Sequence, residues 1–292
     1  MVPLLLELFI CLTLGAWLGW TLPWLPTRLA QPLIRWGVPL SLSALLLRSQ
    51  PSDALLRVGL LGLLVPLCSL LLLGWAPLRS QIKDPVLRLG AAVGNTAYWG
   101  LPVAVALLPP EAVATAAAYD AAGTFITWSL GPVVLQGVAG NSFRLLSLLW
   151  TSPALQGILL AAIVGRTPWR PVLAELLWWP ARAVFVVALS LVGMRLGLTI
   201  RKRSFEVSSS LPWALAFKLL VVPGMVLLLG QLVPLSPMEL QALVLQAAAP
   251  TALAVLLIAE AEQQAVALAS TQVLCSTVLA MVTVPLWWGL MR

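Results

Sequence analysis

The sequence predicts an all-α integral membrane protein of about ten transmembrane helices, arranged as two inverted five-helix repeats. Three observations lead to this fold class: the composition, the spacing of the apolar runs and an internal repeat. Of the 292 residues, 61% are hydrophobic and 9% are charged. A soluble domain carries roughly 25% charged residues because its surface faces water. Lipid is therefore the expected solvent for most of this chain.

The apolar runs, bounded by charged or turn residues, define ten candidate spans. A spanning helix needs about 20 apolar residues, and most of the runs approach that length, with short connections between them. Numbered from 1 to 10, the spans cover residues 3–22, 31–47, 55–76, 86–108, 113–138, 152–166, 172–196, 211–232, 238–259 and 265–289.

The basic residues predict the orientation of these spans. Alternate connections hold ten Lys and Arg residues on one side and five on the other. Because Lys and Arg are retained in the cytoplasm during insertion, we expect a multi-pass protein of the cell membrane, in bacteria the inner membrane, with both termini on the non-cytoplasmic side. Many of the 14 tryptophans lie near span ends, as in an aromatic belt at the lipid headgroups.

Several function classes do not fit this composition. The formal charge of +7 does not indicate a nucleic-acid partner, because the basic residues form short clusters, such as residues 201–203, between apolar runs. Histidine is absent, and Cys11, Cys68 and Cys275 lie singly in apolar runs. Neither a metal site nor a cofactor is therefore expected, and an enzyme is disfavoured for the same reason.

The two halves of the chain resemble one another. Pro23-Trp24-Leu25-Pro26 after span 1 returns 145 residues later as Pro168-Trp169-Arg170-Pro171 after span 6. Four further pairs keep the same order: Leu40-Ser41-Leu42 with Leu189-Ser190-Leu191, Val65-Pro66 with Val222-Pro223, Pro102 with Pro250, and Thr124 and Pro132 with Thr277 and Pro285.

This repeat predicts the domain organisation. We assign residues 1–138 to the first five-helix repeat, 139–151 to a cytoplasmic connection and 152–292 to the second repeat. An odd number of spans places the second copy upside down, which gives a pseudo-two-fold axis in the membrane plane. Inverted repeats of this kind are typical of secondary transporters that work by alternating access.

Span 4 carries polar and helix-breaking residues in its middle, in the run Gly94-Asn95-Thr96-Ala97-Tyr98-Trp99-Gly100-Leu101-Pro102. Proline lacks an N–H donor and clashes with the preceding turn. We therefore predict a break between Asn95 and Pro102, and a second break in span 9 at Ala249-Pro250-Thr251. Broken helices at corresponding positions of two repeats indicate a midplane substrate site; ordinary proline kinks are the alternative.

The two breaks supply the candidate substrate-binding residues. Half-helix N-termini that face one cavity favour an anion, and Asn95 and Thr251 can donate hydrogen bonds to a carboxylate. The chain has two tyrosines, Tyr98 in the polar run of span 4 and Tyr119 next to Asp120 in span 5. The predicted substrate site consists of Asn95, Tyr98, Pro102, Pro250 and Thr251.

Two ionisable residues within spans are candidates for ion coupling. Asp120 follows Tyr119 in span 5, and an acid inside a span usually pairs, faces water or carries protons. Lys218 in span 8 is a candidate counter-ion for Asp120 or for an anionic substrate. The alternatives are an interfacial Asp120 and a Lys218 whose ammonium reaches the cytoplasmic interface.

Five segments of this sequence resemble the auxin efflux carrier family, which is grouped with the sodium/bile acid symporters. They are the span 4 run, the Tyr119-Asp120 pair, Lys218 before Pro223, Ala249-Pro250-Thr251-Ala252, and the close from Ser276-Thr277 to Pro285-Leu286. The resemblance covers the whole chain and implies a scaffold part, a transport part and proline breaks that cross. It also implies small organic anions as cargo, such as indole-acetate, malonate or malate. Ala254 stands where the family often has an asparagine, which removes one polar ligand.

The expected function is secondary transport of a small organic anion by alternating access. The expected partners are the lipid bilayer and the anion, and the sequence leaves a homodimer open. Coupling to protons or to sodium is also open, because the carbonyls of a broken helix can hold sodium. A sodium-coupled carrier is thus one alternative, and an ion channel is another.

Overall fold

The computed structural model describes residues 2–48, 53–136, 153–202 and 205–292, and these residues are mostly helical. Three of the helical segments, η1 to η3, are π-helical turns. In chain order the segments are α1 (Val2–Thr21), α2 (Leu25–Pro32), η1 (Leu33–Gly37), α3 (Val38–Arg48), α4 (Asp53–Gly74), α5 (Ala76–Gln81), α6 (Pro85–Ala92), η2 (Thr96–Gly100), α7 (Leu101–Leu107), α8 (Pro110–Gln136), α10 (Pro153–Val164), α11 (Arg170–Lys202), α12 (Leu211–Ala216), η3 (Phe217–Val221), α13 (Val222–Gln231), α14 (Pro237–Ala247), α15 (Leu253–Ala261) and α16 (Val266–Leu290).

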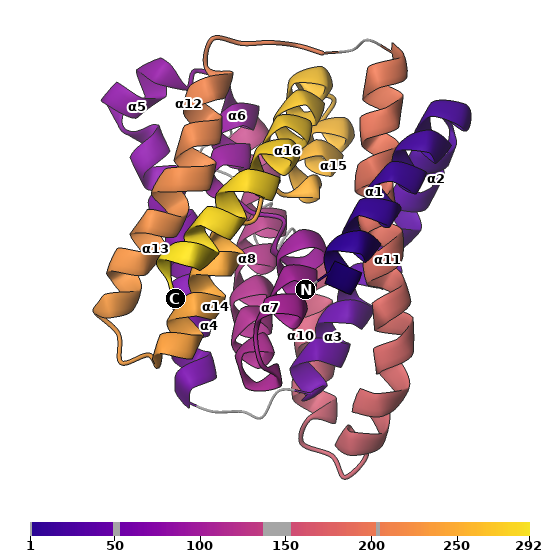
Figure 1. The fold of residues 1–292 in the computed structure, drawn as a ribbon, viewed down its shortest axis with the longest axis vertical. Helices are drawn as coiled ribbons and strands as arrows, with labels where there is room; N and C mark the ends of the chain where they lie inside the picture. The colour runs from indigo at the N-terminus through magenta and orange to yellow at the C-terminus, as the bar shows by residue number, and fades with distance from the viewer. Residues whose placement is uncertain (1, 49–52, 137–152, 203–204) are drawn as a thin grey trace.

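The helices divide into two groups that pack side by side (Figure 1). In the first group, α11 contacts α1, α2 and α3, and α3 contacts α10. In the second group, α8 contacts α4, α7, α14 and α15, while α16 contacts α6 and α15. Spans 1, 2, 6 and 7 of the sequence therefore form the first group, and the remaining predicted spans form the second.

Glycines allow α1 and α11 to approach closely within the first group. Gly15 and Gly19 lie one turn apart on α1, and Gly193 and Gly197 lie one turn apart on α11. A Cβ atom on Gly19 would lie 1.9 Å from the Met194 carbonyl oxygen, and one on Gly197 would lie 1.9 Å from the Ala16 carbonyl oxygen. Paired glycines at this spacing are a common means of packing membrane helices.

Four helical segments in the described ranges are long and apolar enough to cross a membrane. They are Leu55–Gly74, Arg170–Lys202, Leu211–Gln231 and Val266–Leu290, and shorter apolar helices cover Phe9–Thr21, Thr96–Leu107 and Leu155–Val164. Large apolar side chains such as Leu71, Leu228 and Leu290 are more than 60% exposed, as expected for surfaces that face lipid. The fold is that of an all-α multi-pass membrane protein. The predicted connection 139–151 lies outside the described residues.

Predicted spans 4 and 9 are each interrupted. In span 4, α6 ends at Ala92 and helix resumes at Thr96; in span 9, α14 ends at Ala247 and helix resumes at Leu253. The predicted position of the first break was wrong, because the non-helical residues are 93–95 and Pro102 lies inside α7. The four helical pieces are α6, η2 with α7, α14 and α15. None of them alone reaches the length of a membrane span.

The π-helical turns explain why Pro102 does not break its helix. Pro39, Pro102 and Pro223 are each the second residue after such a turn, in η1, η2 and η3 respectively. A proline ring clashes with the carbonyl of the residue four positions earlier. Because a π-helical turn widens the helix locally, it can accommodate the ring, and the helix continues past each proline.

Candidate functional site

The two interrupted helices meet at their breaks, in a contact that we call the crossing (residues 93–95 and 250–252). Gly94 and Thr251 form an isolated antiparallel bridge. The Asn95 N–H donates to the Pro250 carbonyl at 2.7 Å, and the Ala252 N–H donates to the Val93 carbonyl at 3.3 Å. Backbone groups that the breaks remove from helices thus satisfy one another, as an apolar environment requires.

Thr251 fixes the crossing to its surroundings. It is fully buried, its hydroxyl donates to the Gly90 carbonyl at 3.0 Å, and its N–H donates to the Ser276 hydroxyl oxygen at 3.0 Å. These bonds tie the crossing to α6 and α16. The N–H and O–H groups of Thr251 both donate to protein oxygens, and the Pro250 carbonyl accepts from Asn95. Pro250 and Thr251 therefore hold the crossing in place and are not free to bind a ligand in this conformation.

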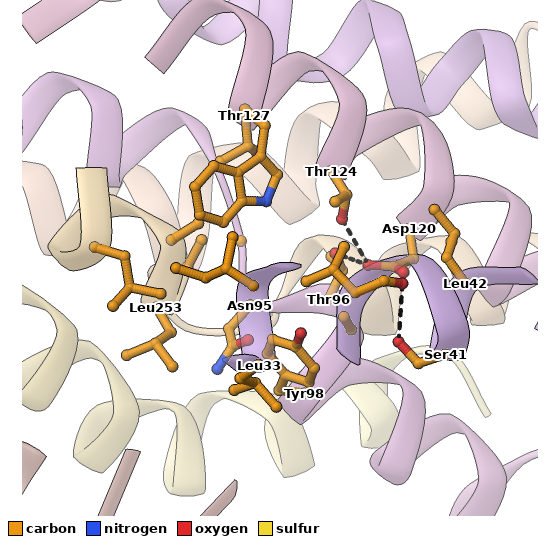
Figure 2. Close-up of a pocket in the computed structure, with 18 residues that line it drawn as sticks. Leu33, Ser41, Leu42, Asn95, Thr96, Tyr98, Asp120, Thr124, Thr127 and Leu253 are labelled. Atoms are coloured by element: carbon orange, nitrogen blue, oxygen red, sulfur yellow. Dashed lines mark hydrogen bonds between the residues drawn. The ribbon is translucent and has the colours of Figure 1, made fainter. Parts of the chain in front are cut away.

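A cavity of about 40 Å³, the central cavity, lies beside the crossing and between the two helix groups (Figure 2). The first group contributes residues of η1 and α3, and the second contributes the crossing, η2, α8 and α15. Its polar lining residues are Ser41, Asn95, Thr96, Tyr98, Asp120, Thr124 and Thr127. Polar side chains from both groups therefore converge on one cavity.

Asp120 is the charged residue of this lining. It is 2% exposed, and its Oδ1 accepts a hydrogen bond from the Thr96 hydroxyl at 2.5 Å and another from the Thr124 hydroxyl at 3.3 Å (Figure 2). The described ranges contain no ion pair to this carboxylate. Asp120 is therefore buried within the protein and does not lie on its surface.

Lys218 lies next to the span 4 break but does not line the central cavity. It is 1% exposed, and its Nζ donates to the Ala247 carbonyl at 2.8 Å, at the C-terminal end of α14. A cation there is favoured by the free carbonyls and by the helix dipole. A small cavity of about 10 Å³ is lined by Lys218, Gly94 and Thr96. In this conformation Lys218 is buried, and among the described residues it forms no ion pair with Asp120.

The structure brings some of the predicted substrate residues together and separates others. Asn95 and Tyr98 line the central cavity, and the Tyr98 hydroxyl has no hydrogen-bond partner within the described part of the chain. Pro102, Pro250 and Thr251 are not among the lining residues. Ala254, the position that departs from the family pattern, does line the cavity, so the missing asparagine would have faced this space.

Several lining residues were not among the predicted site residues. Thr96, Thr124 and Thr127 hold or neighbour Asp120, while Ser41 comes from the first group. Ser41 and Thr124 do occur in the segments that repeat between the two halves, which is a signal that could have singled them out. Their role beside Asp120 depends on how α3, η2 and α8 pack, and the sequence alone does not show that packing.

The described residues form a helical fold with apolar spans and a polar cavity between two helix groups, which is the architecture of a multi-pass membrane protein, and comparison with known proteins assigns its family. A family model described as "Membrane transport protein" matches residues 142–288, which is half of the chain. The chain therefore belongs to this family, the auxin efflux carrier family, and the resemblance stated from the sequence is confirmed.

A curated relative points to the same class. An uncharacterized transporter from Methanothermobacter thermautotrophicus is 26% identical over 205 residues. The match covers 69% of this chain and 66% of the relative, so the chain matches just under two thirds of the relative's length. The relative's description specifies neither a cargo nor a coupling ion.

Proposed function

We propose that the protein is a secondary transporter of small organic anions, such as malate, malonate or an indole-acetate-like carboxylate, and that it works by alternating access. The observation that carries this proposal is the position of the central cavity. It lies beside the crossing and between the two helix groups, which would move relative to one another during transport. The first group would serve as scaffold, and the second would carry the substrate.

The proposed arrangement has ten spans in two inverted repeats, residues 1–138 and 152–292. The paired breaks in spans 4 and 9 support it, because corresponding interruptions are expected when a repeat is inverted. The first group contains spans 1, 2, 6 and 7, which are equivalent pairs in the two repeats. Both termini would lie outside the cytoplasm.

Two helix starts favour an anion in the central cavity. Thr96 and Ala97 begin one helix and Leu253 and Ala254 begin the other, and all four residues line the cavity. The first N–H groups of a helix have no partner within it and carry partial positive charge. Asn95 can donate a further hydrogen bond to a carboxylate.

The size of the central cavity supports an occluded conformation. About 40 Å³ is room for water and too little for a dicarboxylate. The two helix groups would therefore separate on one side to admit the anion.

Asp120 supports coupling to protons. A carboxylate and an anionic substrate in one enclosed cavity repel strongly because the local dielectric constant is low. Proton uptake by Asp120 on substrate binding would remove this repulsion. Sodium coupling is less well supported, because the Lys218 ammonium already occupies a position at broken-helix carbonyls where a cation would bind.

Transport in proteoliposomes tests the proposed function. Radiolabelled mono- and dicarboxylates should show saturable uptake that responds to a pH gradient and not to replacement of sodium by potassium. Sodium-dependent uptake would favour the symporter alternative, whereas currents too large for a carrier cycle would favour a channel. If none of the labelled carboxylates is taken up, small carboxylates are rejected as cargo.

Asp120→Asn should lower the transport rate about tenfold and remove most of its dependence on the proton gradient, because the amide cannot exchange a proton and loses charge-assisted hydrogen bonds. The rate is measured at several internal and external pH values. Glu206→Gln makes the same acid-to-amide change at an exposed position and should behave as wild type. A rate and a pH profile that both survive in Asp120→Asn would rule out the coupling role.

A further inference from the structure

A second cavity lies further along the same interface between the helix groups. Its volume is about 360 Å³, against about 40 Å³ for the central cavity. We call it the vestibule. From the first group, Leu45 and Arg48 of α3 and Trp178 of α11 line it, and the wall from the second group is apolar and comes from α7 and α8. Arg48 is the charged residue of the vestibule lining.

The vestibule and the central cavity follow one another along two helices. On α3, Leu42 lines the central cavity and Leu45 lines the vestibule. On α8, Asp120 lines the central cavity and Ala117 lines the vestibule. Residues three apart lie one helical turn from one another. The vestibule is therefore the adjoining space on the Arg48 side of the central cavity.

Arg48 is held in an orientation that leaves most of its donors available. The guanidinium carbon lies 4.2 Å from the centroid of the Trp178 ring, and Nη2 donates to a Glu175 carboxylate oxygen at 2.6 Å. A cation–π contact orients a guanidinium without using its N–H groups. Among the described residues, one of the five N–H donors pairs with Glu175, and the others can receive a second carboxylate.

The Arg48–Glu175 ion pair is suited to exchange. The Arg48 side chain is 37% exposed and the Glu175 side chain is 71% exposed. Exposed pairs of this kind contribute little to stability because water and salt screen them. A ligand carboxylate can therefore replace that of Glu175, with a guanidinium already oriented for bidentate pairing.

We propose that the vestibule is a second anion site, at which Arg48 binds the carboxylate of the cargo before the cargo reaches the central cavity. This inference rests on the proposed function. The apolar wall formed by α7 and α8 accommodates the hydrocarbon part of the ligand. Glu175 competes with the ligand for Arg48, so the pair limits affinity and allows the anion to leave toward the centre.

The test measures carboxylate uptake in right-side-out and in everted membrane vesicles. Arg48→Gln should raise KM about tenfold when the anion is supplied from the Arg48 side, because a charge-assisted hydrogen bond is lost. The maximal rate from the Arg48 side should stay the same. From the opposite side the KM should stay the same and the maximal rate should fall about tenfold, because no variant changes the equilibrium constant of transport and exit through the vestibule slows together with entry. Arg48→Lys keeps the charge but not the bidentate geometry, and it should give an intermediate KM.

Glu175→Gln separates a binding role from a structural one. Removing the competing carboxylate should lower KM from the Arg48 side, in the direction opposite to Arg48→Gln. If Arg48 merely stabilised the fold through Glu175, both variants would reduce transport alike, and that result would overturn the proposal, as would a KM that Arg48→Gln leaves unchanged. If the wild-type protein transports no carboxylate from either side, the proposed function itself fails and the vestibule proposal falls with it.

Discussion

Gly197→Ala is expected to lower the free energy of unfolding by about 3 kcal/mol, because the added methyl group has no space between α1 and α11. Its Cβ would lie 1.9 Å from the Ala16 carbonyl oxygen. That atom belongs to the backbone, so the two helices would have to move apart along their whole contact. The measurement is thermal unfolding of the purified protein in detergent, with equal amounts of wild type and variant.

Gly59→Ala is the matched control for this prediction. Gly59 lies inside α4, and a Cβ atom there would meet nothing within 4 Å. Alanine has a higher helix propensity than glycine, so this variant should be as stable as wild type or slightly more stable. Equal unfolding temperatures for the two variants would show that the close approach of α1 and α11 contributes little to stability.

Helices whose apolar pattern runs without interruption could be predicted closely from the sequence. Predicted spans 1, 3 and 10 correspond to α1, α4 and α16. Span 7 was placed at 172–196, and α11 extends six residues further, to Lys202. The predicted span stopped short of the basic cluster at residues 201–203, whereas α11 reaches Lys202. Arg195, inside the predicted span, forms an ion pair with Glu260. The apolar run therefore underestimates the length of this helix.

Sequence reasoning located the interruption of span 4 but misplaced it by several residues. Proline is a strong local signal, and Pro102 was taken as one limit of the break. The actual limit is set by tertiary contacts, since residues 93–95 leave the helix to bond with residues 250–252. Because a π-helical turn precedes Pro102, the proline is accommodated. Neither the bridge nor the turn has a signature in the local sequence.

The candidate site shows the same division between local and tertiary information. Asp120 and Lys218 were singled out because ionisable groups within spans are costly, and both are indeed buried. Their separation by the span 4 break was not predictable, since it depends on the packing of η2, η3 and α8. The hydroxyl groups around Asp120 belong to residues that are common in any helix, so composition could not distinguish them.

Glu260→Gln is expected to destabilise the protein and to change its transport rate, because Glu260 forms the ion pair that joins the two helix groups. Arg195 of α11 donates to both carboxylate oxygens of Glu260 at the end of α15, with Nη2 to Oε2 at 2.9 Å. Nearby, the hydroxyl oxygens of Thr199 and Ser270 lie 2.6 Å apart and join α11 to α16. Arg195 and Thr199 both lie near the C-terminal end of α11, whereas Trp178, which lines the vestibule, lies near its start. These two contacts are therefore at the opposite end of the interface from the vestibule.

The size of this effect follows from the burial of Arg195. Its side chain is 8% exposed and that of Glu260 is 30% exposed, so removing the carboxylate leaves a guanidinium that water hardly reaches. We expect a loss of about 3 kcal/mol in the free energy of unfolding, measured by thermal unfolding in detergent. For comparison, Glu175→Gln breaks the exposed pair within the first group and should cost less than about 1 kcal/mol.

A double variant distinguishes the ion pair from general packing. Arg195→Met/Glu260→Leu replaces both charges with apolar groups, and it should recover most of the stability that Glu260→Gln loses, because no unpaired charge remains. Its transport rate should nevertheless differ from that of wild type, since the link that closes this end of the interface is absent. If the double variant transports at the wild-type rate, the ion pair serves stability alone, and opening of the interface at this end is controlled by other contacts.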